Sequence, residues 1–156
     1  MAADSEGSIY FVGRRTSRVR KVDAFGQVST VAGDGLQGYG GDGGPATQAR
    51  LDEPEAIAVE GRENLYIADT GNYRIRKVDR SGRIATIAGS GEWGSGGDGG
   101  PARNAEFSAV DGLAADVAGN VYIADTWNDA IRKIDLSGNI ARVAGTGEEG
   151  SSGDGR

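Results

Sequence analysis

Aspartates flanked by glycine are the residues of this chain whose type and spacing come closest to a metal site. Asp42, Asp98 and Asp154 recur at a constant spacing of 56 (98 − 42 and 154 − 98) in Gly-Asp-Gly segments, and Asp34 precedes the first of them. Calcium takes roughly 6–8 oxygen ligands, whereas each segment offers one or two carboxylates. We therefore expect no metal and no other cofactor, and interpret these aspartates as Asx-turn residues or caps of a following short helix.

Three glycine-rich segments fit the Gly-x-Gly-x-x-Gly pattern of dinucleotide-binding loops, at 33–38, 89–94 and 145–150. A dinucleotide site needs this pattern between a parallel strand and a long helix. Here it occurs three times and follows a short apolar segment in each case. We therefore predict backbone turns, because glycine tolerates positive φ angles.

Two pairs of acid and amide side chains offer a further candidate site for a polar ligand. Asp69 lies three residues before Asn72, and Asp125 lies three residues before Asn128. Such short-range pairs commonly hydrogen-bond within a turn. We predict that these four residues are structural.

Basic pairs also recur, at 20–21, 76–77 and 132–133, each two residues before an aspartate. A basic face for RNA is one interpretation. The net charge of −6 and the pI near 4.7 argue against nucleic acid and anionic membrane as partners. We therefore predict cross-strand charge pairs on a solvated outer strand.

The composition excludes several classes of catalytic and metal site. The chain has no His and no Cys, which removes the commonest general base, the commonest transition-metal ligand and any thiolate chemistry. No apolar run approaches the roughly 20 residues that span a bilayer. The first residues have neither the basic nor the apolar region of a signal peptide. We expect a soluble protein, and the compartment stays undetermined.

One constant spacing connects all these motifs. Tyr10, Tyr66 and Tyr122 are also 56 apart (66 − 10 and 122 − 66), and no insertion breaks the register. Such regularity indicates a repeat architecture in which each unit buries its apolar face against a neighbour. A motif that occurs in every copy is therefore expected to build the repeat.

Each copy reads as four short strands joined by turns. In the second copy the apolar segments lie at 56–59, 65–68, 74–78 and 84–88. Four such strands form one antiparallel meander, and meanders in register form a β-propeller. We predict an all-β fold in a single domain, 1–156, with three blades at about 1–56, 57–112 and 113–156.

A long connection follows the fourth strand of each copy. In the second copy Pro101 is followed by Ala, Arg and Glu, which predicts one or two helical turns. Phe107, and Leu51 in the first copy, are expected to fill an apolar gap beneath this loop.

The stretch 65–77, with Asp69-Thr70-Gly71-Asn72 at its centre, resembles the core of an NHL repeat. The Gly-Asp-Gly-Gly-Pro-Ala loop resembles the extended NHL repeats of bacterial proteins and teneurin-type propellers. The third copy keeps the pattern as Asp125-Thr126-Trp127-Asn128, whereas the first, Gly13-Arg14-Arg15-Thr16, lacks the Asp and the Asn. The resemblance implies six blades per ring and favours a bacterial, exported protein.

Some propellers related to this family are lyases or lactonases that hold a metal with His and carboxylates. Without His, such chemistry would rest on carboxylates such as Glu60 and Asp116 at the ends of the inner strands. We therefore expect a protein that is not an enzyme. The alternatives are a fragment of a lyase-like or lactonase-like propeller, and a half-propeller whose only activity is assembly.

Three copies account for half of a six-bladed ring. Three full repeats would end at position 168 (3 × 56), so the chain stops 12 positions short (168 − 156), and the missing ones correspond to Pro101 through Gly112. Apolar faces at both ends would attract a partner. We expect the chain itself to be that partner, as a homodimer that closes the ring. The alternative is a fragment of a longer propeller.

Residues that differ between copies are the best binding candidates, because the architecture does not require them. In a four-stranded meander, the turn after the second strand and the loop after the fourth emerge on one face. Aromatic residues among polar loops favour a binding surface for a protein, peptide or glycan. An alternative is that they cover neighbouring loops. The candidates are Tyr39, Tyr73, Trp93, Trp127, Arg14, Arg15 and Glu92.

Overall fold

The computed structural model describes residues 1–61 and 64–150, and these residues form three four-stranded antiparallel sheets. In every sheet the strands pair in sequence order, as a meander. Blade 1 contains β1 (Ala2–Ala3), β2 (Ile9–Gly13), β3 (Arg18–Val22) and β4 (Val28–Ala32); blade 2 contains β5 (Pro54–Glu60), β6 (Asn64–Asp69), β7 (Arg74–Val78) and β8 (Ile84–Ala88); blade 3 contains β9 (Val110–Ala115), β10 (Val121–Asp125), β11 (Ala130–Ile134) and β12 (Ile140–Ala144). The predicted all-β, propeller-like architecture is confirmed.

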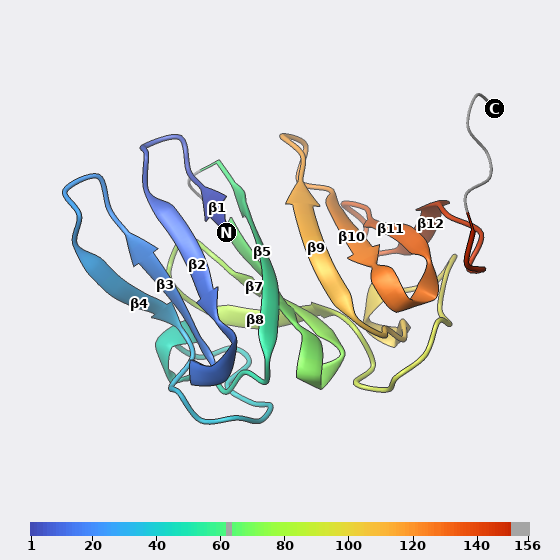
Figure 1. Cartoon of the computed structure of the whole chain (residues 1–156), viewed down its shortest axis with the longest axis horizontal. Coiled ribbons are helices and arrows are strands. Elements are labelled where there is room, and N and C mark those ends of the chain that lie inside the picture. The colour runs from blue at the N-terminus through green and yellow to red at the C-terminus, as the bar shows by residue number, and fades with distance from the viewer. Residues whose placement is uncertain (62–63, 151–156) are drawn as a thin grey trace.

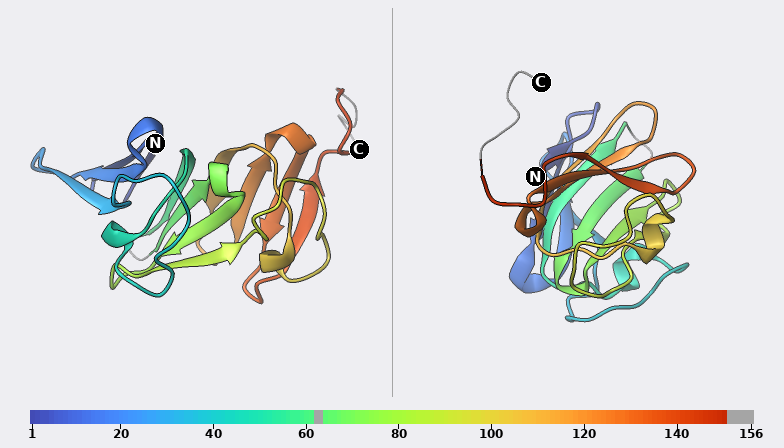
Figure 2. Two further views of the ribbon diagram at one scale, coloured as in Figure 1. Left: turned by 90° about the horizontal axis from the view of Figure 1, so that it is seen from below. Right: turned by 90° about the vertical axis from the view of Figure 1, so that its right-hand side faces the viewer.

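The three blades stand face to face in a row (Figure 1). The inner strand of each blade contacts its counterpart in the next, with β5 beside both β1 and β9. Figure 2 shows blade 1 and blade 3 at opposite ends of the row. Two sheet faces are therefore left without a neighbouring blade.

Two apolar clusters hold the row together, one in each gap between blades. Each blade turns one face, here named the front face, toward the blade before it and the opposite back face toward the blade after it. The front-face residues are Leu65, Ile67, Val78 and Ile84 in blade 2, and Val121, Ile123, Ile134 and Ile140 in blade 3. All eight are buried, so the stacking of blades forms the core.

An aspartate starts the hairpin between the third and fourth strands of each blade. In blade 2, Asp79 Oδ1 accepts hydrogen bonds from the backbone N–H groups of Ser81 (2.9 Å) and Arg83 (3.0 Å). Asp23 and Asp135 make the same contacts in the other blades. The turn is thus specified locally, by a side chain that replaces backbone partners.

The long loops after blades 1 and 2 each lie along the outer strand of the following blade. Gly43 donates its N–H to the carbonyl of Ile84 (2.7 Å), and Ile84 donates to Gly44 (3.1 Å). Each of the two loops that are described throughout contains one 3-10 turn, η2 (Ala46–Gln48) or η4 (Ala102–Asn104). No helix among the described residues is long and apolar enough to cross a membrane.

The predicted loop plugs are present. Leu51 and Phe107 are fully buried, each within the cluster of one blade gap. Pro101 lies just before the 3-10 turn in extended conformation, with a φ of −59° and a ψ of 129°. The loop is therefore anchored by apolar burial rather than by a long helix.

The prediction that the recurring arginines lie on a solvated strand is wrong for Arg76 and Arg132. Arg76 is completely buried in the gap between blades 1 and 2. Its guanidinium donates to Asp69 Oδ2 (2.9 Å) within the blade and to Asp42 Oδ1 (2.8 Å) in the preceding loop. The reason is that β7 is covered on both faces, and the front-face charge is neutralised by carboxylates rather than by water.

The same arrangement recurs in the next gap. Arg132 donates to Asp125 (3.3 Å) and to Asp98 (2.9 Å). Asp42 and Asp98 do lie in turns, but neither caps the following 3-10 turn. Their carboxylates instead connect each loop to the next blade. Asp34 does close an Asx-type turn, accepting the N–H of Leu36 at 2.8 Å. Asp154 lies outside the described residues.

We name the buried arrangement of one arginine and two aspartates the arginine clasp. In the clasp of Arg76, the pKa values of the two carboxyl groups shift in opposite directions. Burial raises the pKa of Asp69 above its ordinary value, in spite of donors from Asp52, Asn72 and Arg76. Burial also raises the pKa of Asp42, but hydrogen bonds from Thr86, Arg76 and Tyr39 and the charge of Arg76 outweigh burial and lower it overall. Asp69 therefore depends on its donors to stay ionised.

Gly89 illustrates why the first glycine of each Gly-x-Gly-x-x-Gly segment cannot be replaced. Its φ is +99°, and an added Cβ would overlap the carbonyl oxygen of Tyr73. Gly82 has a similar φ of +77° but no atom within 4 Å of such a Cβ. We expect Gly82→Ala to cost about 1–2 kcal/mol, the penalty of a left-handed conformation alone. Gly89→Ala should cost more in a urea denaturation, because the backbone must also move; equal costs would contradict this account.

Candidate functional site

The turns after the second strands form one face of the row of blades. Each is a 3-10 turn followed by a residue with positive φ. The turns are η1 (Arg14–Thr16), η3 (Thr70–Asn72) and η5 (Thr126–Asn128), and the following residues are Ser17, Tyr73 and Asp129. The backbone of this face is therefore regular, and its differences lie in the side chains.

The acid and amide pairs lie inside these turns. Asn72 donates to Asp69 at 2.9 Å, and Asn128 donates to Asp125 at 2.8 Å. Blade 1 has neither residue, and the hydroxyl of Thr16 donates to the carbonyl of Gly13 at 3.1 Å instead. The first copy therefore keeps the turn although its sequence departs from the pattern.

Each turn also contacts the inner strand of the next blade. The hydroxyl of Thr70 donates to the carbonyl of Val110 at 3.2 Å. Arg14 occupies the register of Thr70 in blade 1 (70 − 14 = 56). Its guanidinium forms ion pairs with Glu53 (2.7 Å) and Glu55 (2.9 Å) of blade 2. A charged contact thus replaces a neutral one at this position.

A hollow of about 400 Å³ lies between these turns and the inner strands of blades 2 and 3. Four of the predicted binding residues line it: Arg14, Tyr73, Trp93 and Trp127. Trp93 is 62% exposed and Trp127 is 73% exposed. They are the two tryptophans of the chain, and they come from different blades. We name this cavity the turn-face hollow.

The other three predicted binding residues do not line the turn-face hollow. Arg15 and Glu92 have exposed side chains. Tyr39 belongs to the gap between blades 1 and 2, where its hydroxyl donates to Asp42 (3.0 Å) and its ring lies 4.0 Å from the guanidinium carbon of Arg74. The geometry therefore gives Tyr39 a packing contact.

The sequence reasoning missed the acidic side of the hollow. Glu55 and Asp111 lie at the same register of the inner strands β5 and β9 (111 − 55 = 56). Burial raises the pKa of Glu55 above its ordinary value, and the hydrogen bond and negative charge of Asp111 raise it further. These two residues could have been predicted, because an acidic residue recurs at one register of two otherwise apolar strands.

The carboxylates that the sequence did suggest for catalysis are engaged elsewhere. Glu60 accepts hydrogen bonds from Asn64 (2.7 Å) and Tyr66 (2.9 Å). Asp116 accepts the backbone N–H groups of Ala118 and Asn120 in the β9–β10 turn. Neither lines the turn-face hollow. Within residues 1–61 and 64–150, no three acidic side chains are grouped closely enough to hold a metal ion.

Backbone strain accompanies the turn-face hollow. Glu53, which lines it, has a φ of +42°. This conformation is uncommon for a residue other than glycine. Ala109, at the same register in blade 3, does not share it. Strain that the repeat does not require is typical of functional positions.

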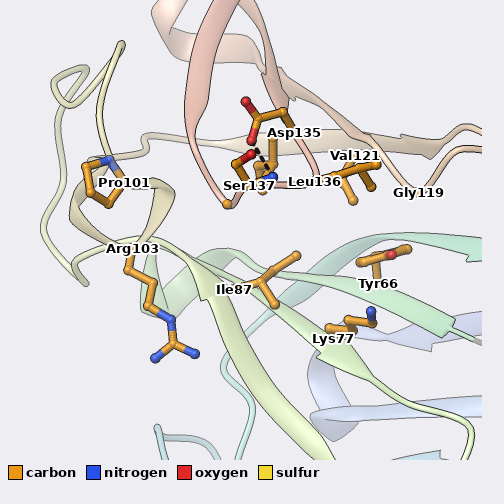
Figure 3. Close-up of a pocket in the computed structure, with 12 residues that line it drawn as sticks. Tyr66, Lys77, Ile87, Pro101, Arg103, Gly119, Val121, Asp135, Leu136 and Ser137 are labelled. Atoms are coloured by element: carbon orange, nitrogen blue, oxygen red, sulfur yellow. Dashed lines mark hydrogen bonds between the residues drawn. The ribbon is translucent and has the colours of Figure 1, made fainter.

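A larger hollow lies on the opposite side of the blades but belongs to the repeat. Its volume is about 460 Å³, and side chains of blades 2 and 3, including Tyr66, Lys77 and Leu136, face one another across it (Figure 3). A hollow of about 270 Å³ occupies the same position between blades 1 and 2, with Tyr10 and Lys21 in place of Tyr66 and Lys77. Because both gaps have it, we assign it to the architecture.

Known proteins share these repeats. The family model described as the Teneurin NHL domain matches residues 35–96. NHL repeat-containing protein 2 of Gallus gallus is 43% identical over 101 residues, which cover 62% of this chain and 13% of the relative. Teneurin-1 of Gallus gallus is 36% identical over 78 residues, covering 44% of this chain and 3% of the relative. Residues 35–96 are therefore similar to NHL repeats. The chain spans only a small part of the length of these relatives.

Solved structures with propeller-like folds resemble these blades. A protein of unknown function from Bacteroides thetaiotaomicron superposes with a TM-score of 0.71 and 26% identity, over 88% of this chain and 33% of that one. A streptogramin B lyase superposes with a TM-score of 0.60 and 15% identity, over 90% of this chain and 38% of that one. At that identity the lyase shows the fold alone.

Proposed function

We propose that these NHL blades form a non-enzymatic binding module whose turn-face hollow holds a basic side chain of a peptide partner. One observation supports this most: two exposed tryptophans and the adjacent carboxylates of Glu55 and Asp111 line the same hollow. These residues differ from their counterparts in other copies or face each other across a blade gap. The repeat explains the turns around the hollow but does not require its aromatic and acidic lining.

The charges of the hollow favour a cationic ligand. Three carboxylates, of Glu53, Glu55 and Asp111, face one guanidinium, that of Arg14. Arg14 pairs with the two glutamates, and no ion pair of Asp111 is found among the described residues. An ammonium or guanidinium group between Glu55 and Asp111 would oppose the burial and the negative charge of Asp111 that raise the pKa of Glu55. The faces of Trp93 and Trp127 add cation–π attraction.

Tryptophan fluorescence tests the proposal directly, because both tryptophans of the chain line the hollow. We expect acetyl-Gly-Lys-Gly-amide to change the emission saturably, and the norleucine analogue, equal in length but uncharged, to leave it unchanged. Asp111→Asn should weaken binding by about tenfold or more, since a hydrogen bond to a charged group contributes about 1.5–3 kcal/mol. Asp129→Asn, on the same face outside the lining, is the matched control. Equal response to both peptides would refute a cationic ligand.

The same titration should depend on pH. Because the pKa of Glu55 is raised, this carboxyl takes up a proton at a higher pH than an ordinary glutamate. A cation binds the ionised form, so affinity should fall as the pH is lowered through that raised pKa. Glu55→Gln should remove this step and leave only the decline caused by ordinary carboxylates. An unchanged pH profile in that variant would exclude Glu55 from binding.

The lyase or lactonase alternative has less support. The likeness to streptogramin B lyase shows the fold alone. The inner-strand carboxylates Glu60 and Asp116 are occupied by hydrogen bonds within turns. No described arrangement favours catalysis over binding.

A further inference from the structure

We propose that the two open faces of the row dock on each other between two copies of the chain, head to tail. The front face of blade 1 of one copy would pack on the back face of blade 3 of the other. Both gaps inside the chain show this contact already, so the proposed contact continues an existing interface. It does not depend on any ligand in the turn-face hollow.

The front face of blade 1 has the composition of a buried face. The positions that are buried in blades 2 and 3 are occupied in blade 1 by Ile9, Phe11, Val22 and Val28 (65 − 9, 67 − 11, 78 − 22 and 84 − 28 each give 56). All four are apolar. Val28 is 55% exposed, whereas its counterpart Ile84 is fully buried. This face therefore lacks only its neighbour.

The back face of blade 3 is its complement. Tyr122, Ala124 and Ile131 line a shallow apolar hollow of about 250 Å³ at the far end of the row. Their counterparts in blade 2, Tyr66, Ala68 and Ile75, are buried against blade 3 (122 − 66, 124 − 68 and 131 − 75 each give 56). Ile131 is 39% exposed. In the gap between blades 2 and 3, the equivalent positions of blade 2 pack against the front face of blade 3.

The exposed Arg20 favours a blade of this chain's own type as the occupant. Arg20 has the register of Arg76 and Arg132 (76 − 20 = 56), yet it is exposed and its side chain forms no hydrogen bond or ion pair to another described residue. Its blade has Gly13 where the others have Asp69 and Asp125 (69 − 13 = 56). An arginine at this position pairs with the loop aspartate of the preceding blade.

The contact between copies forms between separate molecules, whereas the gaps within the chain join blades of one molecule. We therefore expect reversible association that increases with concentration. If six blades close a ring, it ends at a dimer with twice the 16.0 kDa mass of the chain.

Sedimentation velocity over a range of concentrations, without peptide, tests the proposal. We expect the mass of the wild-type species to rise from 16.0 kDa to twice that value. Val28→Asp and Ile131→Asp should each raise the concentration of half-maximal association at least tenfold, because each places a carboxylate in an apolar contact. Val117→Asp, at a fully exposed position in the β9–β10 turn, should associate like the wild type. Far-ultraviolet circular dichroism checks that all variants are folded.

Mixing the two variants tests whether the copies associate head to tail. Val28→Asp keeps an intact back face and Ile131→Asp keeps an intact front face, so the mixture retains one good interface per pair. We expect the mixture to associate at concentrations where each variant alone is monomeric. A wild-type chain that is monomeric throughout, larger open assemblies, or a mixture that does not associate would each overturn the proposal. Loss of association in Ile131→Asp alone would show a back-to-back dimer and overturn it too.

Discussion

Arg76→Met should lower the free energy of unfolding by about 3–5 kcal/mol, the cost of breaking a buried ion pair by removing one partner. The guanidinium is completely buried and neutralises Asp69, whose carboxylate is equally buried. Met has a similar length but no charge, so Asp69 would lose its cation and Asp42 would lose its connection to blade 2. Urea denaturation followed by circular dichroism measures the loss.

Arg20→Met is the matched control, since Arg20 occupies the same register in blade 1 (76 − 20 = 56) but is exposed. Measured at concentrations where the chain is monomeric, it should change the free energy of unfolding by no more than about 0.5 kcal/mol. A double variant, Arg76→Met with Asp69→Asn, should recover part of the loss because the stranded charge is removed. Equal effects of the two arginine variants would show that burial of Arg76 contributes nothing.

Phe107→Ala should produce a loss of similar size, about 3–5 kcal/mol, because a fully buried aromatic ring is removed and a cavity stays behind. Phe107 packs in the gap between blades 2 and 3, beneath the long loop, with Ala105 and Val110 in the same cluster. The loop should also lose its anchor. Hydrogen exchange of the Gly94 and Gly99 amides, which donate to the carbonyls of Phe107 and Ile140, would report that loosening separately from global unfolding.

Phe25→Ala provides the comparison within the same chain. Phe25 is 89% exposed, in the β3–β4 turn of blade 1. Its removal should change the free energy of unfolding by no more than about 0.5 kcal/mol. If Phe107→Ala changed the free energy of unfolding as little as this control, the burial of Phe107 could not be what anchors the loop.

The sequence determined the repeat, and with it the strands and turns. Short apolar segments and Asp-x-x-Gly hairpins act over a few residues, so the four strands of blade 2 were predictable to within two residues at each end. The burial of Leu51 and Phe107 followed from a large apolar residue at the same register of both long loops (107 − 51 = 56). Such features depend on local chemistry and are therefore visible in one copy.

The tertiary structure decided which side chains meet across the gaps between blades. Asp42 and Arg76 are far apart in sequence, as are Glu55 and Asp111, so neither pair resembles a motif. The sequence indicated a solvated charge for Arg76, because nothing local shows that β7 is covered on both faces. Arg14 joined Trp93 and Trp127 around one hollow only because the turns of successive blades emerge on the same face. Local chemistry thus specified each blade, whereas the stacking of blades determined the buried clasps and the site.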